Sequence, residues 1–246
     1  MLQNYTIFNK SLDAIKQPKA LISTINAHSY NTVNEDIDFQ RALRSSDVLL
    51  PDGVSVVWAM RLLTGQKIKK IAGADLFQYE MERINKIGGK CFFLGSSEDT
   101  LNMISKKAEV DYPNLQVYSY SPPYKKEFSA EDNKAMIDAV NEVQPDVLFI
   151  GMTAPKQEKW AFRYYDELNV GHVCCIGAVF DFYAGKVSRA PHWMIEFGFE
   201  WLYRLVKEPR RLWRRYLVGN AKFIFSILTE KMQIPETFSH SVTLNN

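Results

Sequence analysis

Short apolar runs alternate with longer amphipathic segments along most of this 246-residue chain, and this alternation constrains the fold more than any other feature. Six apolar runs are predicted strands, at 20–25, 47–50, 90–95, 115–120, 146–151 and 172–177. Helical patterns lie around and between them, at 33–44, 54–63, 74–87, 97–109, 129–143 and 156–167. Continuously apolar strands that alternate with helices are typical of a parallel sheet covered on both faces. We therefore predict an α/β fold, a Rossmann-like, mainly parallel sheet with helices on both faces.

The alternation stops near Gly185, and the chain becomes basic and aromatic from about Ser188. The basic residues there are Arg189, Arg204, Lys207, Arg210, Arg211, Arg214 and Arg215. The large rings among them are Trp193, Phe197, Trp201, Tyr203, Trp213 and Tyr216. Such a segment fits a surface that is both apolar and anionic, and a phosphate-bearing bilayer is the first candidate. The sequence predicts a catalytic-type domain over 1–187 and a helical, membrane-associating appendage over 188–246.

The composition of the whole chain limits which binding partners and which cellular location we expect. The net charge is only +2, so the basic character is local to the appendage, and we do not expect nucleic acid as the partner. The three cysteines lie in apolar runs without the spacing of a zinc site, which predicts reduced thiols and no metal. The N-terminus lacks a secretory signal, and no uncharged apolar stretch approaches 18 residues. We expect a cytoplasmic protein held peripherally at the inner face of the membrane.

Small and polar residues follow the predicted strands, where open α/β sheets bind ligands. These positions include Thr24 and Asn26, Asp52 and Gly53, and the glycines Gly95, Gly151 and Gly177. A glycine directly after a strand lets a ligand approach the backbone, and the following helix N-terminus favours phosphate. Three of them indicate a nucleotide cleft, although each could instead serve a tight turn. The chain has neither a G-x-G-x-x-G motif nor a P-loop, which disfavours a standard dinucleotide or P-loop site.

Three polar residues near these strand ends are candidates for chemistry or binding. Asp52 could accept a proton from an attacking sugar hydroxyl, or it could be the N-cap of the helix at 54–63. Asp181, flanked by aromatic residues, suits binding of a ribose or a base, or a turn. Gln157 begins a predicted helix and could orient a phosphate or a sugar, or be exposed there.

Several long motifs occur in an order that resembles the WecG/TagA/CpsF family of bacterial glycosyltransferases (glycosyltransferase family 26). They are T-I-N-A, L-L-P-D-G-V-S-V-V, I-A-G-A-D-L, F-F-L-G-S, G-M-T-A-P-K-Q-E, I-G-A-V-F-D-F-Y-A-G-K-V-S-R-A-P and E-W-L-Y-R-L-V-K-E-P-R-R. The resemblance covers nearly the whole chain. It implies transfer of a sugar from a UDP-sugar to an undecaprenyl-diphosphate-linked sugar in cell-surface polysaccharide biosynthesis. N-acetylmannosamine, its uronic acid and glucose are the donor sugars that it leaves open.

The resemblance also implies an inverting, metal-independent mechanism without a cofactor. It makes Asp52 the general base and places Thr24 and Asn26 near the reacting sugars. It puts Gln157 and Asp181 at the UDP site. The arginines that would neutralise the diphosphate are Arg204, Arg211 and Arg214.

Two other functions fit the same residues. A non-catalytic membrane adaptor could bind nucleotide or anionic lipid through the basic appendage and would need no base. A single-stranded nucleic-acid binder could use the same rings and arginines, but the near-neutral body disfavours it. The sequence is compatible with a homo-oligomer and does not fix the oligomeric state.

Overall fold

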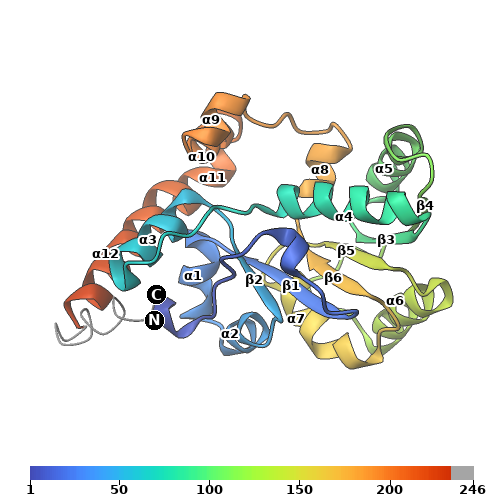
Figure 1. Ribbon diagram of the computed structural model, residues 1–246, viewed down its shortest axis with the longest axis horizontal. Helices are drawn as coiled ribbons and strands as arrows, with labels where there is room; N and C mark the ends of the chain where they lie inside the picture. Colours follow the sequence, from blue (N-terminus) through green and yellow to red (C-terminus); the bar gives the residue numbers. More distant parts are fainter. Residues whose placement is uncertain (234–246) are drawn as a thin grey trace.

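The computed structural model describes residues 1–233, and these form a parallel sheet with helices on both faces (Figure 1). The strands are β1 (Ala20–Ile25), β2 (Val48–Pro51), β3 (Lys90–Gly95), β4 (Gln116–Tyr120), β5 (Val147–Gly151) and β6 (His172–Cys175). Their order is β2-β1-β6-β5-β3-β4, and every pairing in this sheet is parallel. Each predicted apolar run overlaps one of these strands, so the predicted fold class is confirmed.

Helices of the body cover the sheet in two layers. One layer consists of α4 (Gly73–Ile87), α5 (Glu98–Asp111) and α8 (Val179–Tyr183). The opposite layer consists of α2 (Ile37–Arg44), α6 (Ala130–Val143) and α7 (Lys156–Tyr164). The chain leaves β1 towards the second layer and leaves β6, its neighbour, towards the first. In α/β sheets a ligand crevice forms where adjacent connections part in this way.

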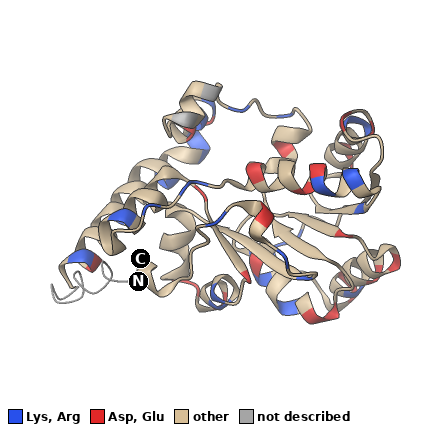
Figure 2. Cartoon of the chain, viewed as in Figure 1, with Lys and Arg blue, Asp and Glu red and all other residues tan. Residues whose placement is uncertain are grey.

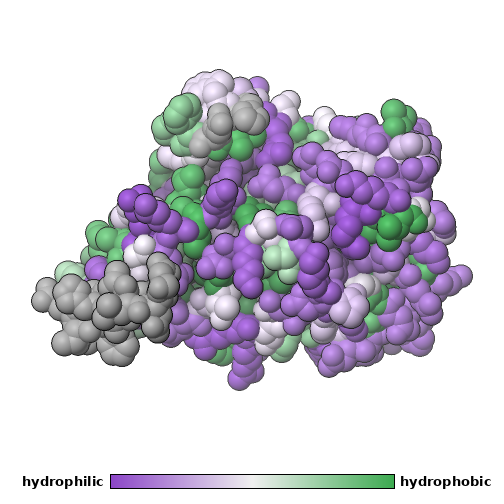
Figure 3. Space-filling view, in the orientation of Figure 1, coloured by the Kyte–Doolittle hydropathy of each residue, from purple (hydrophilic) through white to green (hydrophobic). Residues whose placement is uncertain are grey.

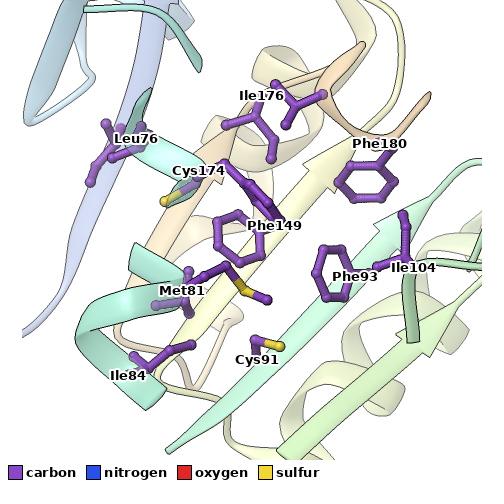
Figure 4. Packing of buried hydrophobic residues seen from close by; sticks show 14 of the residues in the cluster. Leu76, Met81, Ile84, Cys91, Phe93, Ile104, Phe149, Cys174, Ile176 and Phe180 are labelled. Atoms are coloured by element: carbon purple, nitrogen blue, oxygen red, sulfur yellow. The ribbon is translucent and has the colours of Figure 1, made fainter. Parts of the chain in front are cut away.

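The core beneath α4 and α8 follows from the two-residue period of the strands. Figure 4 shows Met81 and Ile84 of α4 pointing down onto strand residues that include Phe93 and Phe149. The rings of Phe93 and Phe149 stack with centroids 5.3 Å apart, and both are essentially fully buried. The next residue along each strand faces the other layer, which explains why the strands are apolar throughout.

One helix of the structure was not predicted. The segment predicted at 33–44 corresponds to α2 and shares only residue 33 with α1 (Ala27–Val33), and each of these helices has its own N-cap. The Asn26 side chain accepts the backbone N–H groups that begin α1, and the Asp36 carboxylate accepts the N–H of Phe39 in α2. Side-chain acceptors of this kind satisfy the free amides at a helix start. Short 3₁₀ turns lie at η1 (Leu2–Asn4), η2 (Leu12–Ala14) and η3 (Tyr165–Glu167).

The predicted helical appendage contains several helices of unequal burial. They are α9 (His192–Glu196), α10 (Glu200–Lys207), α11 (Pro209–Trp213), a π-helical turn η4 (Arg214–Val218) and α12 (Gly219–Met232). The last of these packs against α1 and against α3 (Val54–Thr64), as Figure 1 shows. Within it, Phe223 and Ile227 are fully buried. Residues 234–246 of the predicted appendage lie outside the described residues.

A buried carboxylate joins α12 to the beginning of the chain. Glu230 accepts the backbone N–H groups of Leu2 and Gln3, at 2.9 and 3.2 Å, and the hydroxyl of Tyr30 at 3.0 Å. Its side chain is 4% exposed, so these bonds replace water almost completely. Among residues 1–233, no helix combines the length and the apolar composition needed to cross a bilayer.

Candidate active site

A polar cavity of about 250 Å³ opens at the carboxyl ends of the strands. Of the residues predicted from the sequence, it is lined by Thr24, Asn26, Asp52, Gly151, Gln157, Gly177, Asp181, Arg204 and Arg211. The body supplies the strand ends and the start of α7, and the tail helices α10 and α11 supply the arginines. The structure thus brings nine residues from five separate motifs into one site.

An apolar cavity of about 500 Å³ adjoins the polar one. It lies between α3 and the tail, and its apolar lining consists of Ala27, Val54, Trp58, Ile195, Trp201, Tyr216, Phe223 and Ile224. The predicted residue Gly53 lines this second cavity. The residues shared by the two cavities are Asn26, His28, Asp52, Arg204 and Arg215. The candidate base therefore lies at the junction of a polar and an apolar compartment.

Asp52 directly follows β2, and its backbone N–H donates to the carbonyl of Ile25 in β1 at 2.9 Å. The N-cap of α3 is Gly53, at φ +111°, and no side chain caps that helix, so the Asp52 carboxylate is not used as a cap. Burial, helped by the negative charge of Glu200, raises the pKa of Asp52 to about 6. A carboxylate with such a pKa is largely ionised at neutral pH and more basic than an ordinary aspartate.

Asn26 is the N-cap of α1, and its side chain also interacts with the Asp52 carboxylate. Its Oδ1 accepts the N–H groups of His28 and Ser29, both at 3.0 Å. The Asn26 side chain also bonds to Asp52, which acts to lower the pKa of the acid. The cap of α1 thus orients the amide beside Asp52.

His28 was not a sequence candidate, yet it lines both cavities. Burial, together with the positive charge of Arg215, lowers its pKa to about 4. The imidazole is therefore uncharged at neutral pH. Its position two residues after Asn26 is the signal that could have found it, because the first turn of a helix after a strand faces the same crevice.

Gln157 and Glu158 lie in the first turn of α7 and are almost fully buried, at 4% and 3% exposure. Gln157 Nε2 donates to Glu158 Oε1 at 2.9 Å. Burial raises the pKa of Glu158 to about 7, although the bond from Gln157 opposes the shift. Sequence reasoning selected Gln157 and missed Glu158, because an acidic residue in the first turn of a helix is usually exposed.

The glycines after the strands have two different roles. A Cβ on Gly151 would lie 2.4 Å from the ring of Phe180, and one on Gly95 would lie 2.7 Å from the Gly151 carbonyl oxygen. Gly95 lines neither cavity and is required for the close approach of β3 to β5. Gly177 faces Gln157, since a Cβ there would come within 3.4 Å of Oε1. Gly95 thus serves the packing of two strands, whereas ligand access stays a prediction for Gly151 and Gly177, which line the polar cavity.

The arginines of the tail are divided between the site and the surface. Arg204 and Arg211 line the polar cavity, and Arg215 lines both cavities. The side chain of Arg214, which the sequence had selected, is exposed and lies over the ring of Trp213, 5.2 Å from its centroid. The i,i+4 spacing joins Arg210 to Arg214 as well as Arg211 to Arg215, so the sequence alone does not select Arg215.

Two of these guanidinium groups have buried donors without a protein acceptor. The Nε atoms of Arg204 and Arg215 are buried and make no hydrogen bond to the described residues. Arg211, in contrast, has its Nε 2.7 Å from Glu208. Figure 2 shows further basic residues (blue) along the linker from α8 to α9. Unpaired cationic donors at a cavity favour an anionic ligand such as a phosphate.

Large apolar side chains are exposed on α3 and on the tail. They include Trp58, which lines the apolar cavity, and Trp193, Phe197, Phe199, Trp213 and Phe225. In Figure 3 hydrophobic residues (green) gather over the tail helices. Within the described part of the chain, no cluster of three or more His, Cys, Asp or Glu side chains could hold a metal ion.

Comparison with known proteins agrees with a sugar-transferring site. The model of the glycosyl transferase WecG/TagA/CpsF family matches residues 3–236. A curated relative from Bacillus subtilis (strain 168) is 32% identical over 86% of this chain and 80% of its own length. Another, from Bacillus spizizenii, is 29% identical over 85% of this chain and 79% of its own length. Both are named N-acetylglucosaminyldiphosphoundecaprenol N-acetyl-beta-D-mannosaminyltransferase.

The fold and the site thus define an enzyme that transfers a sugar, a glycosyltransferase, and not a non-catalytic adaptor. The chain belongs to the WecG/TagA/CpsF family.

Proposed function

We propose that this enzyme transfers a sugar from a UDP-sugar to an undecaprenyl-diphosphate-linked sugar, with inversion and without a metal ion. N-acetylmannosamine is the first candidate for the transferred sugar, because the two curated relatives are named for it. Its uronic acid and glucose are the alternatives. The position of Asp52 at the junction of the polar and the apolar cavity carries this proposal.

The donor occupies the polar cavity, with its diphosphate against Arg204, Arg211 and Arg215. The buried, unpaired Nε atoms of Arg204 and Arg215 support this placement, since phosphate oxygens can only accept hydrogen bonds. The arginines stabilise the charge that develops on the departing diphosphate, a task that a metal ion performs in other transferases.

The acceptor reaches Asp52 through the apolar cavity, with its polyprenyl chain among the rings of α3 and the tail. A hydroxyl oxygen of the acceptor sugar attacks the anomeric carbon, and the bond from that carbon to the UDP oxygen breaks. UDP leaves with the electron pair, and the hydroxyl proton passes to Asp52. The exposed apolar and basic residues of the tail rest on the cytoplasmic face of the membrane, where such an acceptor is held.

The direct test measures UDP release from UDP-N-acetylmannosamine, its uronic acid and UDP-glucose, each with and without a lipid-diphosphate-N-acetylglucosamine analogue. We expect release with one donor and only when the acceptor is present. Release that ignores the acceptor with every donor would overturn the proposal.

The assignment of the base has its own test. Asp52→Asn keeps the shape of the side chain but cannot accept the proton, so kcat should fall about 10²- to 10⁴-fold. The Kd for UDP should stay within about twofold of wild type by calorimetry. Near-normal turnover of this variant would remove Asp52 from the role of base.

A further inference from the structure

Gln157 and Glu158, in the first turn of α7, form a buried polar pair. The residues around the pair do not satisfy all of its hydrogen-bonding groups. Gln157 and Glu158 are bonded to each other through one atom each, and both line the polar cavity. The other oxygens of the pair, Gln157 Oε1 and Glu158 Oε2, are buried and make no hydrogen bond to the described residues. Leaving a buried acceptor unpaired is unfavourable, and more so for a charged group. Such atoms in a native structure call for a partner.

The cavity therefore contains two groups of unpaired polar atoms, one of donors and one of acceptors. Its unpaired donors, the Nε atoms of Arg204 and Arg215, belong to the tail, and its unpaired acceptors belong to α7. Phosphate oxygens suit the first group and would be repelled by the second, because acceptor would face acceptor. Hydroxyl and N–H groups suit the second group.

The pair lies near the middle of the row of strand ends. Glu158 is close enough to Cys175 of β6 to contribute to the raised pKa of that thiol, and Gln157 faces Gly177 just beyond β6. Asp52 follows β2, two strands away, which is roughly 10 Å at the usual spacing of strands. A nucleotide sugar with its reacting carbon near Asp52 is long enough to reach the pair.

We propose that Glu158, together with Gln157, accepts hydrogen bonds from hydroxyl or N–H groups of the nucleotide-sugar donor. This contact orients the donor so that its diphosphate lies against the arginines of the tail and not against α7. The inference rests on the proposed function, in which the polar cavity takes the donor. A bond donated to the Glu158 carboxylate would offset the burial that raises its pKa to about 7.

The test compares the binding of UDP and of UDP-N-acetylmannosamine to wild type and to Glu158→Gln by calorimetry. The new amide can still accept from Gln157 through Oε1, but it presents an NH₂ group where the free oxygen was. A donor group of the ligand would then face another donor. We expect Kd and KM to rise about 10- to 100-fold, in line with the loss of a hydrogen bond to a charged group. The kcat at saturation should stay within about threefold of wild type.

Glu98→Gln is the matched control, since Glu98 is in the first turn of α5, is exposed and lines neither cavity. Its Kd and KM should stay within about twofold of wild type. If Glu158→Gln weakens binding of UDP itself, the contact is to the nucleoside. If it weakens only UDP-N-acetylmannosamine, the contact is to the sugar. Either result supports the proposal.

Values for Glu158→Gln within twofold of wild type for both ligands would overturn it. If the glutamine variant does not fold, Glu158→Asp keeps the charge and withdraws the oxygens by one methylene group, and the same thresholds apply. A wild-type enzyme that binds neither ligand would instead contradict the proposed function, and this inference would fall with it.

Discussion

Helices α10 and α12 belong to the same basic and aromatic tail, but the structure uses them in different ways. No residue of α10 is buried, and its Arg204 and Glu200 face the cavities. In α12, Phe223 and Ile227 are fully buried against α1 and α3, and Glu230 holds the N-terminal segment. The first helix completes the site, and the second completes the core. One segment of the chain thus has two functions, and burial separates them.

The largest effect expected on stability comes from α12. Ile227→Ala should destabilise the protein by about 2–5 kcal/mol, because it removes a fully buried side chain and leaves a cavity. Leu228→Ala, at a neighbouring position that is 46% exposed, should cost less than about 1 kcal/mol. Urea unfolding followed by circular dichroism measures both. Equal losses would mean that α12 is not part of the core.

The next effect tests the part of the tail that faces the site. Arg215→Ala should lower kcat/KM about 100-fold, since it removes a donor aimed at the diphosphate, and should leave the unfolding midpoint nearly unchanged. Arg214→Ala, one residue earlier and exposed, should lower kcat/KM less than about fivefold. Steady-state kinetics of the two variants decide between the positions. A larger loss of kcat/KM in Arg214→Ala than in Arg215→Ala would instead support Arg214, the residue predicted from the sequence.

The smallest effect concerns the charge that α10 places near the base. Asp52 must be ionised to accept a proton, so kcat/KM should fall as the pH drops below about 6, the pKa of this acid. Glu200→Gln removes a negative charge that raises this pKa, although burial raises it more. The acidic limb should therefore move to lower pH, by less than about one unit.

Glu208→Gln serves as its control, because Glu208 lines the polar cavity but is not among the groups that shift Asp52. The pH–rate profiles of both variants should be compared with that of wild type. If the acidic limb does not move in Glu200→Gln, the charge of Glu200 in α10 does not influence the pKa of Asp52.

The sequence predicted the sheet well because each buried parallel strand must be apolar on both faces, which leaves a pattern in the chain. It also predicted Asp52, Asn26 and Gln157, since polar residues after such strands meet at one edge. It could not show that Glu158 is buried, because that depends on how the start of α7 packs beneath the strand ends. Nor could it show which parts of the tail face the site and which join the core. Only tertiary contacts distinguish Arg215 from Arg214, and α12 from α10.

The carboxylate of Glu230 has a consequence for synthesis of the protein. Its partners Leu2 and Gln3 lie more than two hundred residues before it in the chain, so they are synthesised well before Glu230. Leu2, which is fully buried, has no complete packing until then. Contacts so distant in the chain form late and slowly. The core around α1, α3 and α12 therefore cannot be completed before α12 has been synthesised.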